Sequence, residues 1–126
     1  MSKVPETLRR GALGEAYTAR QLTRSGYEIL ARNYRCPYGE IDIIACRDGI
    51  LAFVEVKTRS KTAWYSPGTA VTASKRQKLI CTAQWYLERF PRQLQPRFDV
   101  AEVYLEDGGA AVEHMRYLEN AFDAKG

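Results

Sequence analysis

The spacing of hydrophobic and polar residues switches along the chain between a helical period and a strand period. Apolar residues separated by threes and fours predict one helix over about residues 6–25 and another over about residues 73–90. Short β-branched runs predict strands over residues 27–34, 39–47, 50–57 and 98–105, with an edge strand over residues 110–117. The order helix, three strands, helix, strand predicts an α/β domain in which helices cover a mixed sheet of four to five strands.

Each predicted helix has an apolar stripe that indicates which face enters the core. The stripe of the second helix is Ile80, Ala83, Leu87 and Phe90. The stripe of the first helix is Leu8, Ala12, Ala19 and Leu22, and Glu15 completes its regular spacing. A glutamate in a core-facing stripe is costly unless it is paired or used, so Glu15 is a candidate functional residue. Gly11 and Gly14 beside it would let the helix approach the sheet closely.

Asp48 and Gly49 separate two apolar runs, which is a strong signal for a β-hairpin. With these two residues in the turn, the register places Asp42 opposite Glu55, and Glu40 opposite Lys57. Two carboxylates that face each other across a pair of strands repel. The hairpin therefore predicts a positive partner for them, and a divalent metal ion is the natural candidate.

Asp42, Glu55 and Lys57 form the pattern D-x12-E-x-K, and its last two residues point to the same side of a strand. Carboxylate oxygens suit Mg2+ or Mn2+, so we expect Asp42 and Glu55 to be metal ligands. Lys57 would orient or deprotonate an attacking water or stabilise phosphate charge, and Glu15 would assist from the helix. The alternative is that Lys57 simply pairs with Glu40 or Glu55 at a strand end.

Basic and aromatic residues gather in two further places, which predicts contacts with nucleic acid. One is the segment after the third strand, with Arg59, Lys61 and Trp64, and the other is the start of the second helix, with Lys75 and Lys78. Free N–H groups at a helix start also favour phosphate. The alternatives are a solvated charged face for the lysines, and a loop packed on the domain or on a dimer partner for Trp64.

The composition limits the class of protein. The 126 residues fit one domain, in which we expect residues 1–5 and about 118–126 to be frayed. The net charge of +4 is compatible with a nucleic-acid partner. Three cysteines without C-x-x-C spacing argue against disulfides and zinc, and the single histidine, His114, argues against a Ser-His-Asp site. We expect a cytoplasmic protein without a membrane partner, because no apolar stretch is long enough to span a bilayer.

Five short segments occur in a specific order between about residues 11 and 103: Gly14-Glu15-Ala16, Arg32-Asn33-Tyr34-Arg35, Gly39-Glu40-Ile41-Asp42, Phe53-Val54-Glu55-Val56-Lys57-Thr58-Arg59 and Arg97-Phe98-Asp99-Val100. This set resembles the PD-(D/E)-x-K nuclease superfamily, which includes restriction endonucleases and archaeal Holliday-junction resolvases, and more closely the bacterial YraN-like family. The resemblance implies a restriction-endonuclease-like core with Glu15, Asp42, Glu55 and Lys57 as its site. Ile41 stands where the superfamily pattern has proline.

We therefore expect a metal-dependent endonuclease in which metal-activated water attacks a phosphodiester. DNA is favoured over RNA as substrate, and branched or damaged structures are candidates. A homodimer would suit a substrate with two equivalent strands. The alternative is a non-catalytic nucleic-acid-binding or interaction module that keeps the fold, and a third reading is a structural accessory protein that works through the Trp64 loop.

Overall fold

The computed structural model describes residues 6–60 and 71–124. Over this part of the chain it contains α1 (Glu6–Arg24), β1 (Glu28–Cys36), β2 (Gly39–Arg47), β3 (Ile50–Ser60), α2 (Ala73–Arg89), β4 (Gln95–Leu105) and β5 (Val112–Phe122). The strands form one sheet in the order β1-β2-β3-β4-β5. The pairing of β3 with β4 is parallel and the other pairings are antiparallel. The predicted mixed α/β architecture is confirmed.

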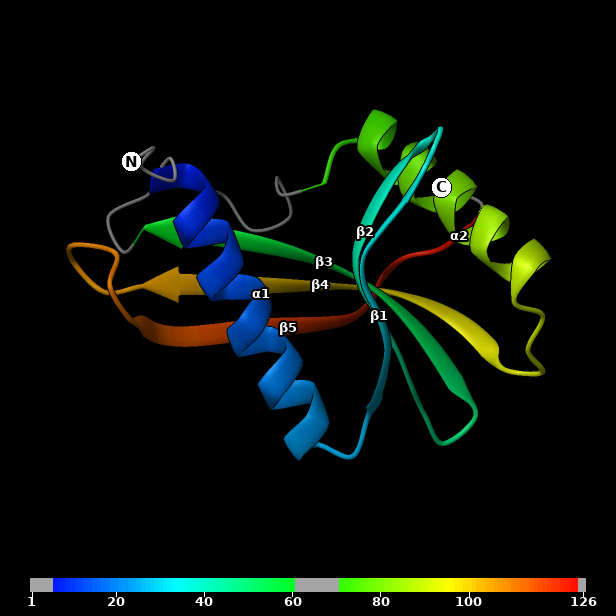
Figure 1. Ribbon diagram of the computed structural model, residues 1–126, viewed down its shortest axis with the longest axis horizontal. Coiled ribbons are helices and arrows are strands. Elements are labelled where there is room, and N and C mark those ends of the chain that lie inside the picture. Colours follow the sequence, from blue (N-terminus) through cyan, green and yellow to red (C-terminus); the bar gives the residue numbers. More distant parts are fainter. Residues whose placement is uncertain (1–5, 61–70, 125–126) are drawn as a thin grey trace, which may run out of the picture.

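The helices cover opposite faces of a strongly twisted sheet (Figure 1). On one face, Leu79, Ile80, Ala83 and Tyr86 of α2 pack with apolar residues of the strands. On the other face, Leu22 of α1 packs in a second cluster that includes Ile43, Val54 and Ala101. The central strands β2 and β3 are buried from both sides, which explains why their sequences are apolar without alternation.

The hairpin forms as predicted at its turn. Asp48 and Gly49 have φ angles of 49° and 80°, the positive values that a two-residue turn of this kind needs. The register runs from Arg47 opposite Ile50 to Ile43 opposite Val54 and ends there. Beyond that pair, the carboxylate of Asp42 accepts the N–H of Val56 at 2.7 Å. The side chain of Asp42 thus takes the hydrogen bond that a backbone carbonyl would otherwise accept.

The predicted stripe of α1 is wrong in its first half. Leu8 is 63% exposed, and the buried positions are Gly14, Thr18 and Leu22, four residues apart. Gly14 allows this face of α1 to pack against the sheet, because a side chain at position 14 would collide with Thr58 Oγ1 of β3. Gly11 has open space beside it, so only Gly14 provides the predicted close approach.

Two predictions for the second half of the chain are also corrected. Phe90 caps the C-terminal end of α2 and is 49% exposed, while Tyr86 takes the core position and meets the Tyr34 ring edge-on. The tail is not frayed from residue 118, since β5 continues to Phe122. Leu118 packs against the core and Phe122 stacks on Phe98, so apolar burial holds this end of the chain in the sheet.

Candidate functional site

Three carboxylates from α1 and β2 meet at the point where the β2–β3 pairing ends. One oxygen each of Glu15, Glu40 and Asp42 lies within 4.8 Å of the others. Glu40 and Asp42 reach the same side because they are two residues apart on β2. The close approach of α1 at Gly14 places the neighbouring Glu15 over the end of that strand. We call Glu15, Glu40 and Asp42 the acidic cluster.

Asn33 of β1 joins two members of the acidic cluster. With its amide nitrogen turned toward the acids, it donates to Glu15 Oε1 at 2.8 Å and to Glu40 Oε1 at 3.0 Å. Asn33 has a φ of 52° within a strand, a conformation that asparagine tolerates better than most residues. Arg35 Nε contacts the other oxygen of Glu40 at 2.9 Å. The β1 strand therefore orients the acidic cluster from the side opposite β3.

The environment of Asp42 opposes its negative charge. Burial, together with the charges of Glu15 and Glu40, raises the pKa of the Asp42 carboxyl to about 7, although the hydrogen bond from Val56 N–H works in the other direction. The ionised form of a carboxyl group in this position is unfavourable unless a positive partner lies nearby. The donor set is three carboxylates, which suits a hard cation such as Mg2+.

Glu55 lies next to this cluster but has positive partners of its own. Its Oε1 lies 3.5 Å from Lys57 Nζ and 3.4 Å from Lys75 Nζ, while the side chain is 9% exposed. Lys57 follows on the same side of β3, and Lys75 comes from the first turn of α2. Thr72 fixes the start of that helix, because its hydroxyl accepts the N–H of Lys75 at 3.2 Å.

The two lysines are perturbed in opposite directions. Burial, followed by the neighbouring Lys75, lowers the pKa of Lys57 below its ordinary value. Burial also disfavours charge on Lys75, but its contact with Lys57 and the carboxylate of Glu55 raise its pKa overall. Burial and the charge of Asp42 raise the pKa of Glu55. The site thus contains one lysine whose pKa is lowered beside another whose pKa is raised.

The structure brings Glu15, Asp42, Glu55 and Lys57 into one region, and it changes their grouping. Glu55 pairs with lysines, as the alternative for Lys57 held, and Glu40 lies with Glu15 and Asp42 instead of facing Lys57. Sequence reasoning left Glu40 and Asn33 out of the site. The spacing of Glu40 and Asp42 on one strand could have identified the first, whereas the role of Asn33 depends on its positive φ.

The residues predicted to contact nucleic acid fall into different places. Lys75 lies in the site, and Lys78 is exposed one turn further along α2. Arg59 belongs to β3, not to a loop, and its buried guanidinium contacts Glu102 at 3.3 Å. The Arg59 side chain is only 7% exposed, so little of it is available to a phosphate. Lys61 and Trp64 lie outside the described residues.

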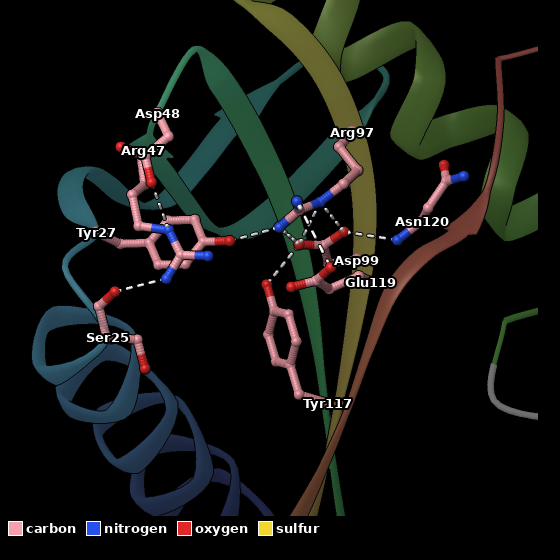
Figure 2. A network of polar contacts seen from close by, with 9 residues as sticks. All are labelled: Ser25, Tyr27, Arg47, Asp48, Arg97, Asp99, Tyr117, Glu119 and Asn120. Atoms are coloured by element: carbon pink, nitrogen blue, oxygen red, sulfur yellow. Dashed lines mark hydrogen bonds and ion pairs between the residues drawn. The ribbon is translucent and has the colours of Figure 1, made fainter.

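A separate polar network surrounds the buried Asp99 of β4 (Figure 2). Arg97 contacts Asp99 Oδ2 at 2.8 Å and donates to Tyr27 at 2.5 Å. The hydroxyl of Tyr117 donates to Asp99 at 2.6 Å, and the backbone N–H of Asn120 donates at 2.9 Å. The residues that contact Asp99 all donate to it, and the network joins β4 to β5 and to Tyr27, which precedes β1.

Comparison with known proteins places the whole chain among close relatives. Residues 14–103 match the model of a family described as "Uncharacterised protein family UPF0102". A UPF0102 protein of Symbiobacterium thermophilum is 48% identical over 117 residues, which cover 92% of this chain and 98% of the relative. A UPF0102 protein of Syntrophotalea carbinolica is 45% identical over 122 residues, covering 96% and 97%. One of Caldanaerobacter subterraneus is 42% identical over 113 residues, covering 89% and 93%.

No helix in residues 6–60 and 71–124 has the length and apolar character needed to cross a bilayer. Cys36, Cys46 and Cys81 are free thiols in this structure. The matched segment begins at Gly14 and ends at Val103, and it therefore contains the acidic cluster together with Glu55, Lys57 and Lys75. The match over this segment and the identity across nearly the full chain show that the protein belongs to family UPF0102.

Proposed function

We propose that this protein is a divalent-metal-dependent endonuclease acting on DNA. The observation that carries the proposal is the acidic cluster beside a second group of one glutamate and two lysines. Few structural roles require three carboxylates within 4.8 Å of one another, because such a group repels itself. A cation would relieve that repulsion.

The residues divide into roles that fit phosphodiester hydrolysis. Asp42, with Glu15 and Glu40, would hold Mg2+ or Mn2+, which lowers the pKa of water and polarises the phosphate. Asn33 holds two of these acids in place. Glu55, predicted from the sequence as a ligand, lies beside them and would join them once its lysines turn toward the substrate.

Lys57 and Lys75 supply the complementary chemistry. Lys57 has a lowered pKa, which suits a group that takes a proton from the attacking water. Lys75 has a raised pKa and retains its charge, which suits a group that stabilises the negative charge gathering on the phosphate. Lys75 stands in the first turn of α2, where free N–H groups also favour an anion.

The test is cleavage of a panel of DNA junctions, flaps, single strands and duplexes with Mg2+, Mn2+ or EDTA. We expect cleavage only with metal, and a loss of at least about 100-fold in Asp42→Asn and Lys57→Met. Asp48→Asn makes the same chemical change as Asp42→Asn in the hairpin turn, where the carboxylate is 88% exposed, and should cleave like the wild type. Unchanged cleavage in the two site variants would refute the mechanism.

One observation favours a second candidate, a nucleic-acid-binding module without turnover. Glu55 contacts two lysines, so that part of the site needs no cation to offset its negative charge. A binding module would need the lysines but no metal. Calorimetric titration with Mn2+ separates the two, since binding that disappears in Asp42→Asn supports the enzyme, and wild-type protein that binds DNA but no metal supports the module.

A further inference from the structure

A cavity of about 370 Å3 opens at the junction of α2, β4 and β5, outside the acidic cluster. Its wall is mainly apolar and includes Val71, Val100, Leu118, Ala121 and Phe122. The charged residues in this wall are Arg76, Glu102 and Glu119. Apolar cavities of this volume with a few polar groups are typical of sites for small flat molecules.

Two of the charged side chains, Arg76 and Glu102, each have a buried atom without a hydrogen bond. Within the part of the chain that the structure describes, Arg76 Nε has no hydrogen-bond partner and Glu102 Oε1 accepts no hydrogen bond. Glu102 is 2% exposed, and its other oxygen is occupied by Arg59 at 3.3 Å. Arg116 lies 3.9 Å from Oε1, which balances charge but is too long for a hydrogen bond. A buried carboxylate oxygen without a donor is costly, and an occupant with an N–H group would satisfy it.

The cavity adjoins the candidate catalytic residues. Glu55 of β3 is the register partner of Val100, and Lys57 is the register partner of Glu102. Adjacent strands are separated by about 4.8 Å, so the cavity wall begins one strand away from the site. Arg76 likewise follows Lys75 directly in α2. A molecule whose phosphate met Lys75 would therefore place its neighbouring atoms at the mouth of the cavity.

We propose that this cavity binds one unstacked nucleobase of the DNA substrate. The inference rests on the proposed function, which supplies the phosphate beside it. A nucleobase is flat and apolar on its faces, and its edge carries an N–H donor next to an acceptor. The donor would satisfy Glu102 Oε1 and the acceptor would receive the N–H of Arg76. Bases become available in this way in bulges, junctions and single strands, whereas a paired base is held in the duplex stack.

The substrate class follows from this assignment. A duplex with an unpaired base next to the scissile phosphate can fill the cavity and the metal site together. A perfect duplex can do so only after a base is extruded, at a cost in pairing and stacking. The protein should therefore select DNA by the presence of an unpaired base, with little regard to which base it is.

The experiment measures binding without cleavage, using the Asp42→Asn protein in EDTA. Fluorescence anisotropy compares three labelled duplexes: one perfect, one with a single-nucleotide bulge, and one whose bulged nucleotide is abasic. We expect the bulged duplex to bind at least 10-fold more tightly than the other two. Equal affinity for the bulged and the abasic duplex would overturn the inference.

Three variants assign the preference to the cavity. Ala121→Trp fills the cavity from an exposed position, and Arg76→Met removes the donor, so each should reduce the preference for the bulge to about 3-fold or less. Arg92→Met removes the same charge from an exposed position outside the cavity and should keep the preference. Circular dichroism confirms folding of each variant. A preference that survives both cavity variants would overturn the inference.

The outcomes separate this inference from the proposed enzyme function. A wild-type protein that cleaves with metal but does not distinguish the abasic bulge retains the nuclease proposal and loses the base site. A protein that distinguishes the abasic bulge through Arg76 and Ala121, yet never cleaves, retains the base site and loses the nuclease proposal.

Discussion

Replacing Asp42 by asparagine should stabilise the metal-free protein while it removes a ligand of the proposed metal site. Asparagine has nearly the same shape as aspartate. In the wild type the Asp42 carboxylate accepts the N–H of Val56 at 2.7 Å, and the amide oxygen of asparagine can accept the same hydrogen bond. The substitution therefore removes mainly the charge. The carboxyl of Asp42 has its pKa raised from 3.8 to about 7, so ionisation at neutral pH works against the folded state.

The sign of the effect follows from the two pKa values. Below pH 3.8 the carboxyl is protonated in the folded and the unfolded chain, and Asp42 adds no pH dependence. As the pH rises toward about 7, the unfolded chain ionises freely while the folded chain resists, and stability is lost. The stability difference between Asp42→Asn and the wild type should therefore grow from about pH 4 and level off above pH 7.

The magnitude has an upper limit of about 4 kcal/mol, from about 1.4 kcal/mol for each pH unit of the rise. Solvent reaches the half-buried carboxylate and screens it, so we expect about 1–2 kcal/mol at pH 8. For a domain of this size, that corresponds to a gain of about 4–8 °C in Tm. Asp48→Asn, in the exposed turn of the same hairpin, should leave the Tm within about 1 °C of the wild type.

The assay is thermal unfolding by circular dichroism from pH 4 to pH 9, with EDTA or with Mn2+. Metal at one hundred times its Kd adds about 2.7 kcal/mol to a protein that binds it only when folded. The wild type should gain this and Asp42→Asn should not, so the order of the two Tm values reverses when metal is added. If Asp42→Asn is less stable than the wild type in EDTA at pH 8, the reasoning about the acidic cluster is wrong.

Three further predictions test the elements that build the site. Gly14→Ala should lower stability by about 1–3 kcal/mol in urea unfolding because its methyl group collides with Thr58, whereas Gly11→Ala, with open space beside it, should be neutral or gain up to about 1 kcal/mol. Lys75→Met should weaken DNA binding several-fold more than Lys78→Met, because Lys75 contacts Glu55 in the site and Lys78 is exposed one turn further along α2. Fluorescence anisotropy in EDTA measures both variants, and equal losses would count against the role of Lys75. Tyr117→Phe should cost about 1–2 kcal/mol in urea unfolding because it removes a donor to the buried Asp99, and an unchanged midpoint would contradict the network in Figure 2.

The parts of the fold that could be predicted from the sequence are those decided by local chemistry. The Asp48–Gly49 turn requires positive φ at both residues and fixes the strand register next to it. The cap at Thr72 and the break after Phe90 similarly bound α2 within the chain segment that forms it. Such signals depend on neighbouring residues only, and they gave the order of the described elements correctly.

The parts that could not be predicted depend on contacts between distant segments. The face of α1 that enters the core is chosen by the fit of Gly14 against Thr58, not by the apolar stripe. Asn33 reaches Glu15 and Glu40 because of its φ of 52°, which strand periodicity does not reveal. The pairing of Lys75 with Glu55 brings α2 onto the strand that carries Glu55, and a hairpin register alone does not reveal this partner.

The two halves of the site differ in charge, and under the proposed function this difference would couple metal binding to DNA binding. Among the residues that the structure describes, the ion pair shown for the acidic cluster is that of Arg35 with one oxygen of Glu40. Glu55 is held away from that cluster by two lysines. A phosphate that attracted Lys57 and Lys75 would release Glu55 as a further ligand, and a cation would remove the repulsion between Glu55 and Asp42. Metal and DNA should therefore each strengthen the binding of the other, an effect that thermodynamic linkage requires to be reciprocal.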